Sequence, residues 1–215
     1  MTFEPTERTE IHRLPENGRF DRASAYSILD EAFICHVGFV DDGQPFVIPT
    51  IHARDEDTLL LHGSVASRML RNLRDGGPLC VTVTLLDGLV LARSAFEHSM
   101  NYRSVVILGT ATEITDPDEK LRAMELLTER IVAGRWPEIR HPNEAEFRKT
   151  RMLRLPLEEA SVKVRTGPPD EEEEDYELDV WAGVVPLMQK VGNPLADPLL
   201  KAGVELPAYL QPYRR

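Results

Sequence analysis

The chain has 215 residues, of which 42% are hydrophobic and 28% charged, and its formal net charge is −11 at pH 7. This length and apolar content are enough for one domain with a buried core, extended by a tail. The acidic balance argues against a nucleic-acid partner, because contacts to phosphate supply most of that affinity. No stretch approaches the roughly 20 apolar residues that a membrane-spanning helix needs.

The N-terminal residues and the cysteines bear on the compartment. Residues 1–20 are polar and acidic, unlike a secretory signal or a basic transit peptide. Cys35 and Cys80 both lie in apolar, strand-like runs, and no CxxC or metal-ligand spacing occurs. Two buried thiols favour a reducing compartment, while the sequence alone leaves a disulfide between them open. We therefore expect a cytoplasmic protein.

The first predicted elements are a short helix and a β-hairpin. Residues 22–31 carry apolar positions at helical spacing and predict a helix, with Asp21 or Ser24 as its N-cap. β-Branched and aromatic residues predict strands over 33–40 and 46–53, joined by a turn at 41–43. Pro49 cannot donate a hydrogen bond to a neighbouring strand. The second strand should therefore be an edge, be bulged, or face a ligand at that point.

The middle of the chain continues this strand-rich pattern. We expect strands over 58–62, 79–86, 89–93, 103–114 and 161–165, with a helix over 65–74 and a turn at 87–88. Gly109 indicates a bulge or a tight bend in the longest strand. A third helix begins after the N-cap Asp116 and ends at Gly134. Its apolar face carries Leu121, Met124, Leu127 and Ile131. Residues 135–147 read as an irregular link with another helical turn.

About six strands joined mainly by short turns predict a mainly β, α+β fold: a six-stranded antiparallel barrel with flanking helices. Residues 1–20 form an N-terminal arm, 21–187 the barrel domain, and 188–215 an extended tail. The five prolines from Pro186 onward argue against a packed segment there, so the tail should cross the body or a second subunit. The acidic block 170–175 reads as a solvated loop, or alternatively as a docking site for a basic partner.

The first polar cluster follows the strand over 58–62. His62 and Gly63 end that strand, and Ser64 is placed to cap the next helix, which carries Ser67 and Arg68 in its first turn. Free N–H groups at a helix start, two hydroxyls and a guanidinium suit a phosphate. The alternative is an ordinary capped surface helix with exposed arginines.

The second polar cluster is Asn101, Tyr102, Arg103 and Ser104, directly before the longest strand. An aromatic ring that stacks and an amide that pairs with ring edges suit a heteroaromatic ligand. The alternative is a loop whose polar groups satisfy one another. His36 and His52 lie on strands that could be neighbours, but no cluster at ligand spacing supports a metal site.

An ordered set of segments over about residues 22–187 resembles the pyridoxamine 5′-phosphate oxidase-like superfamily, whose members have a split β-barrel that binds FMN. The resemblance is greatest to the branch of flavin-nucleotide-binding proteins, similar to the nitroimidazole-resistance reductases. The segments are YSILDEAFICHVGFVDDGQPFVIPT, LLLHGSVASRMLRNL, CVTVTLLDGLVLARSAFEHSMNYRSVVILGTA, DPDEK, SVKVRTGPPD and WAGVVPL.

The resemblance implies a role for each cluster. The strand Val47, Ile48, Pro49, Thr50 would lay its backbone along the flavin ring. His62, Gly63, Ser64, Ser67 and Arg68 would hold the FMN phosphate and ribityl chain, with His62 the candidate proton donor. Asn101, Tyr102, Arg103 and Ser104 would close the site at or near the interface of a homodimer.

The departures from the family pattern narrow the function. Met69 stands where pyridoxamine phosphate oxidases carry a second basic residue, and their Arg-x-His substrate motif is missing from the terminal PAYLQPYRR. We therefore expect an FMN-dependent reductase of small molecules, such as nitro compounds, quinones or flavins. The alternatives are a flavin carrier or sensor without turnover, or a relative that binds haem or the deazaflavin F420. Trp181 is expected to anchor the core or the tail.

Overall fold

The computed structural model describes residues 2–211. Within them the strands are β1 (Gly18–Arg19), β2 (Ile34–Asp41), β3 (Gln44–Asp55), β4 (Thr58–Ser64), β5 (Pro78–Leu91), β6 (Ser99–Thr110), β7 (Thr112–Glu113), β8 (Thr150–Pro156), β9 (Glu159–Arg165) and β10 (Gly183–Pro186). The α-helices are α1 (Arg22–Glu31), α2 (Arg68–Arg74), α3 (Pro117–Ile131) and α4 (Glu144–Lys149). Short 3-10 turns lie at Pro15–Asn17, Trp136–Glu138, Glu173–Glu177 and Ala208–Leu210.

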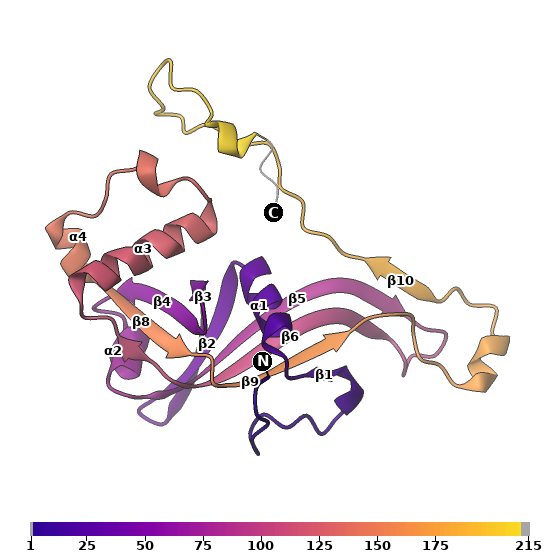
Figure 1. Cartoon of the computed structure of the whole chain (residues 1–215). Coiled ribbons are helices and arrows are strands. Elements are labelled where there is room, and N and C mark those ends of the chain that lie inside the picture. Colours follow the sequence, from indigo (N-terminus) through magenta and orange to yellow (C-terminus); the bar gives the residue numbers. More distant parts are fainter. Residues whose placement is uncertain (1, 212–215) are drawn as a thin grey trace.

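Seven of these strands close into a six-stranded antiparallel barrel, in which β6 and β7 together act as one strand. The strand order is β1-β9-β6-β5-β2-β3-β4-β8-β7, with β10 added to β5 (Figure 1). β7 continues β6 after one residue, so the two act as one strand. The pairing then runs from β2 through β3, β4 and β8 to this combined strand, and from there through β5 back to β2. The predicted fold class is confirmed. The predicted list of strands was incomplete, because no element was predicted over β8, and the predicted last strand, β9, pairs outside this circuit on β6.

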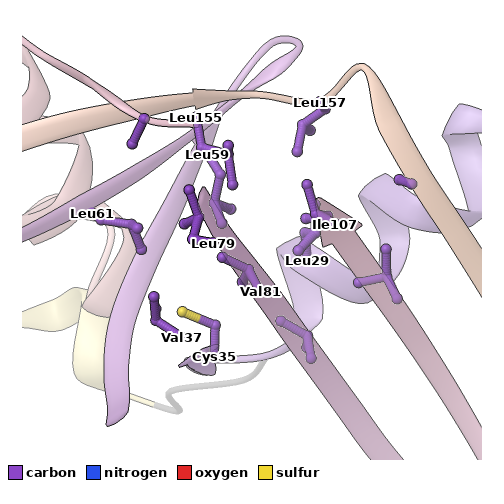
Figure 2. Close-up of a cluster of buried hydrophobic side chains, with 14 of the residues drawn as sticks. Leu29, Cys35, Val37, Leu59, Leu61, Leu79, Val81, Ile107, Leu155 and Leu157 are labelled. Atoms are coloured by element: carbon purple, nitrogen blue, oxygen red, sulfur yellow. The ribbon is translucent and has the colours of Figure 1, made fainter. Parts of the chain in front are cut away.

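The barrel interior is the main hydrophobic core (Figure 2). Leu59 and Leu61 point into it, whereas Leu60 lies between them and packs with the α3 residues Ala123 and Leu127 on the outside. A strand covered on both faces reads as a continuous apolar run, which explains the three consecutive leucines. Further core side chains come from α1 and the other barrel strands, among them Leu29, Cys35, Val37, Leu79, Val81, Ile107 and Leu155.

The capped helices begin close to their predicted positions. Asp21 caps α1 by accepting a hydrogen bond of 2.8 Å from the Ser24 N–H, and Asp116 caps α3. The predicted apolar face of α3 was partly wrong, because Leu121 and Ile131 are exposed. Helix α3 instead packs onto the barrel with the side that carries Ala123 and Leu127.

Two local predictions were wrong. Helix α2 begins at Arg68 and not at residue 65, because residues 65–67 still form a turn after β4. Asp87 and Gly88 do not reverse the chain; they form a bulge in the continuous strand β5. Gly109 does lie beside a bend, since the chain leaves β5 at Thr110 and pairs with β8 from Thr112.

The remaining features concern thiols, membranes and the tail. Cys35 and Cys80 are free thiols. Within residues 2–211, no helix combines the length and apolarity that crossing a bilayer requires. Residues 187–207 contain no helix or strand, residues 208–210 form a 3-10 turn, and residues 212–215 of the predicted tail lie outside the described part.

A buried and an exposed leucine make a matched test of the core. Leu153 is fully buried, and Leu153→Ala should lower the free energy of unfolding by about 2–5 kcal/mol through lost burial and a cavity. Leu121→Ala, on the exposed side of α3, should cost under about 1 kcal/mol. Urea unfolding followed by circular dichroism measures both, and equal losses would contradict this assignment of the core.

Candidate functional site

Strand β3 changes partner midway, and this leaves one of its edges open. Residues 44–51 pair with β2, and residues 52–55 pair with β4. The predicted flavin-facing residues Val47, Ile48, Pro49 and Thr50 all belong to the first half. In the described part of the chain, no strand pairs with the other edge of that half.

The hairpin turn decides which backbone groups reach this open edge. Asp42 and Gly43 have φ angles of 50° and 75°, as in a type I′ turn, which closes on a hydrogen-bonded pair at its ends. Hydrogen-bonded positions then alternate along β3, so positions 45, 47 and 49 direct their backbone groups outward. Two of them, Pro45 and Pro49, have no N–H to leave unpaired. The expectation that Pro49 lies on an edge is therefore confirmed.

The end of β4 and the start of α2 carry the next predicted residues. The ring of His62 is half-buried, and its Nδ1 atom is buried without a hydrogen-bond partner among the described residues. Ser67 is the N-cap of α2 and accepts from the Leu70 N–H at 3.5 Å. Ser64, predicted to cap this helix, instead accepts from the Ala66 N–H at 3.2 Å within the preceding turn.

Arg68 connects this second group with the β2–β3 hairpin. Its guanidinium lies 4.7 Å from the centre of the Phe46 ring, next in sequence to Val47. Its Nε atom is 3.6 Å from an Asp41 carboxylate oxygen. Both side chains of this ion pair are partly exposed, so the pair holds Arg68 only weakly. The structure thus brings the β3 edge and the start of α2 together through Arg68.

The third predicted group lies elsewhere in the same chain. Asn101 to Ser104 do not precede β6 but form part of it, and strands β5 and β2 separate them from β3. Asn101 is only 8% exposed; its amide donates to the Gly167 carbonyl at 3.1 Å and accepts from Arg165 at 2.6 Å. These bonds match the alternative of mutually satisfied polar groups.

Arg103 is held by two carboxylates. It makes a bidentate pair with Asp87, with both distances 2.8 Å, and a second bidentate pair with Glu31. Hydrogen bonds to these two carboxylates raise the pKa of the Arg103 guanidinium, so its charge is permanent. Together with the first residues of the tail, this network lines an open cavity of about 890 Å³. Sequence reasoning missed it, because Asp87 was read as part of a turn.

Burial determines the protonation of two other groups. Burial raises the pKa of the Cys35 thiol to about 12, which makes it an inert core residue. Burial lowers the pKa of His62 from its ordinary value near 6.5. His62 is therefore neutral at pH 7, with one ring nitrogen able to donate and the other to accept.

The structure also locates the other side chains that the sequence singled out. His52 is fully buried on β3, and its Nε2 atom lies 3.0 Å from the Leu29 carbonyl oxygen, whereas His36 is exposed on β2. Residues 2–211 contain no group of three or more His, Cys, Asp or Glu placed to hold a metal ion. Trp181 is 66% exposed, so it does not anchor the core of its own chain.

The family model described as pyridoxamine 5′-phosphate oxidase matches residues 21–164, which contain the whole barrel. The chain belongs to the pyridoxamine 5′-phosphate oxidase family. No curated protein matches it. Among solved members of this fold, the flavocytochrome Anf3 from Azotobacter vinelandii is 38% identical, with a TM-score of 0.93 and 97% of each chain covered.

Two other solved structures extend the comparison within the pyridoxamine 5′-phosphate oxidase family. The FAD and haem binding protein from Mycobacterium smegmatis is 38% identical, with a TM-score of 0.87, and the match covers 91% of this chain and 96% of that one. A protein assigned to 5-nitroimidazole antibiotic resistance, from Bacteroides thetaiotaomicron, is 25% identical, with a TM-score of 0.54 over 68% and 86% of the two chains.

The lowered pKa of His62 makes a pH prediction. The unfolded chain takes up a proton on this ring near pH 6.5, and the folded chain does so only at lower pH. The contribution of His62 to stability is therefore complete above the unfolded pKa and is lost as the pH falls from there toward the folded pKa. NMR titration of the His62 ring should give a midpoint below 6.5. A midpoint at or above that value would contradict the burial of this ring.

Proposed function

We propose that the protein is a flavin-dependent oxidoreductase that binds the flavin between the open edge of β3 and the start of α2. The observation that carries this proposal is the buried, unpartnered Nδ1 atom of His62 beside that edge. A buried polar atom without a partner costs free energy unless a ligand or water satisfies it. Membership of the family and a relative named for FAD support a bound flavin.

The residues present fit a flavin nucleotide. The outward backbone of Val47 to Thr50 would hold the ring, and the Ser64 and Ser67 hydroxyls with Arg68 would hold the phosphate. The start of α2 alone is no phosphate site, because the helix has seven residues and its cap is already used. Arg68 supplies the charge, and its weak pair with Asp41 can exchange for a phosphate.

The bound flavin could be FMN or FAD, and these are the two forms of the proposal. The sequence resemblance predicts FMN, whereas the relative from M. smegmatis, 38% identical, is named for FAD and haem. Both nucleotides bring a phosphate to Arg68 and a ring to β3. We infer FAD, because that relative is 38% identical over 91% of this chain, whereas the nitroimidazole-resistance protein is 25% identical over 68% of it. If the purified protein contains FMN, the prediction made from the sequence resemblance is correct and FAD is excluded.

The flavin supplies hydride or electron transfer when it is bound, and the protein supplies orientation and electrostatics. Neutral His62 would hold a proton on one ring nitrogen at the site and return it to a reduced substrate. Arg68 would neutralise the phosphate. Asn101 to Ser104 lie too far along the sheet to join this site within one chain, so a second copy of the chain in a homodimer would contribute them.

A second candidate is haem binding, which both 38%-identical relatives carry in their names as a flavocytochrome and a haem protein. The outer face of β2 and β3 fits a flat apolar ligand. Ile34, His36, Val47 and Pro49 are exposed there, and register pairs His36 with Pro49. Gly38 keeps the face flat, although an added Cβ would meet only ordinary contacts from 3.4 Å. His36 would hold the haem iron, since one imidazole suffices for this.

The cofactors can be identified directly. The purified protein should release FAD on acid treatment, detected by mass spectrometry, and should show a Soret band if haem is present. His36→Ala should remove the Soret band and leave the flavin, whereas His98→Ala, also an exposed histidine, should leave both. A Soret band that survives His36→Ala would exclude His36 as the ligand. Turnover of NADH or NADPH with nitro compounds, quinones or free flavin then separates an enzyme from a carrier.

Arg68 provides a test of the phosphate site. Arg68→Ala removes a charge-assisted contact of roughly 1.5–3 kcal/mol, which lowers the affinity for the flavin nucleotide by about 10- to 150-fold. Riboflavin has no phosphate, so its affinity should stay the same. Asp41→Asn should strengthen nucleotide binding, because it removes the competing carboxylate. Titration of the apoprotein with both flavins measures these effects.

Arg71 is the matched control for this titration, because it is exposed on the same helix one turn further along. Arg71→Ala should change nucleotide affinity much less than Arg68→Ala. Equal losses for nucleotide and riboflavin in Arg68→Ala would show that Arg68 supports the ring or the fold and not the phosphate.

A further inference from the structure

The tail contains a segment held at both ends and unattached between them. We call residues 188–206 the strap. Just before it, the Leu187 N–H donates to the Asp87 carbonyl at 3.0 Å, and β10 pairs with β5. Just after it, the Tyr209 hydroxyl lies 2.5 Å from a Glu138 carboxylate oxygen and 3.1 Å from an Arg135 nitrogen. The strap therefore has a defined start and a defined end (Figure 1).

Between these anchors the strap makes only local bonds. The Leu200 N–H donates to the Asp197 carbonyl at 2.9 Å, and the Val204 N–H donates to Lys201 at 3.3 Å. Among residues 2–211, no hydrogen bond joins the strap to its own barrel. Figure 1 shows it running apart from the sheet toward the α3 end of the molecule.

All residues of the strap are exposed, and seven of them have large apolar side chains. Met188 is 87% exposed, Leu195 94% and Leu199 90%, and Val191, Leu200, Val204 and Leu206 are also exposed. Its far end and α3 enclose an open, mainly apolar hollow of about 1060 Å³. Fixing an extended segment costs conformational entropy, which exposed apolar side chains do nothing to offset. A stable strap therefore needs a surface that covers these side chains.

The match to a solved relative indicates that the strap's course is not particular to this chain. The A. vinelandii structure aligns with 97% of the chain at a TM-score of 0.93, so the strap is included in the match. A segment with this course and no bonds to its own barrel is held by something else in the folded protein.

We propose that the strap lies across a second copy of the chain, so that two copies clasp each other. This rests on the homodimer in the proposed function and adds which segment holds it together. Seven apolar side chains expose on the order of 400–800 Å² in all, at about 60–120 Å² for each. Two straps and the surfaces beneath them reach about 1,600 Å², which is the usual size of a specific, stable interface. In a symmetric pair each copy gives and receives the same contact.

Substitution within the strap tests the clasp in the full-length protein. Leu195→Glu with Leu199→Glu should raise the dimer dissociation constant by at least about 100-fold, measured by sedimentation and light scattering. The control is Leu121→Glu, an exposed leucine on α3 outside the strap, which should leave the dimer intact. Circular dichroism checks that all variants are folded. A strap variant that stays dimeric, or a monomeric wild type, overturns the clasp.

Cross-linking identifies the molecule that the strap touches. The chain has only five lysines, of which Lys190 and Lys201 lie in the strap. In a mixture of ¹⁴N- and ¹⁵N-labelled copies, cross-links from the strap to Lys120, Lys149 or Lys163 should carry both isotopes. Cross-links of a single isotope would show that the strap folds onto its own barrel and would overturn the proposal.

Flavin content is measured on the same samples, so that the two proposals can fail separately. A dimer without flavin that dissociates on strap substitution keeps the clasp and contradicts the proposed function. A protein that retains flavin but gives no mixed-isotope cross-links keeps the function and contradicts the clasp.

Discussion

The change of partner within β3 is the constraint on which the rest of the molecule depends. Up to Ile51 the strand pairs with β2, and from His52 it pairs with β4. His52 is fully buried at this point, and its ring contacts the carbonyl of Leu29 in α1. The barrel closes because β4 then passes to β8. The same switch leaves half of β3 with an open edge, so the fold and the candidate site have one origin.

The polar side chains of the candidate site come from β4 and α2, which the barrel holds at fixed positions. β4 carries the half-buried imidazole of His62 near its end. The turn after β4 directs α2 back to the β2–β3 hairpin, where Arg68 lies over the Phe46 ring. The permanently charged Arg68, which pairs only weakly with Asp41, lies beside the open backbone edge of β3. A phosphate would match the charge and a flat ring would match the edge, which is the basis of the proposed flavin nucleotide site.

The sequence predicted those parts of the fold that local chemistry determines. Asp21 and Asp116 cap their helices, and the hairpin at Asp42 and Gly43 follows from residues that tolerate positive φ. Strand β8 was missed because its arginines hide the alternation. Arg151 is buried against Glu113, and both residues belong to strands that meet only in the folded barrel. The bulge at Asp87 was missed for a similar reason, since its partner Arg103 comes from the next strand. For the site, residue types near β3 and β4 were foreseeable, whereas the separation of Asn101 from them depends on strand order.

The prolines of β3 affect how well its open edge could pair with a strand of another molecule. An open strand edge normally offers a row of N–H and C=O groups that another strand can extend. At positions 45 and 49 that row has lost its donors, and the single outward N–H between them, at Val47, cannot support a continuous ladder. The edge therefore resists further strand addition while its carbonyl groups stay accessible. An exposed edge of this composition can remain available to a small ligand throughout the life of the protein without becoming a template for aggregation.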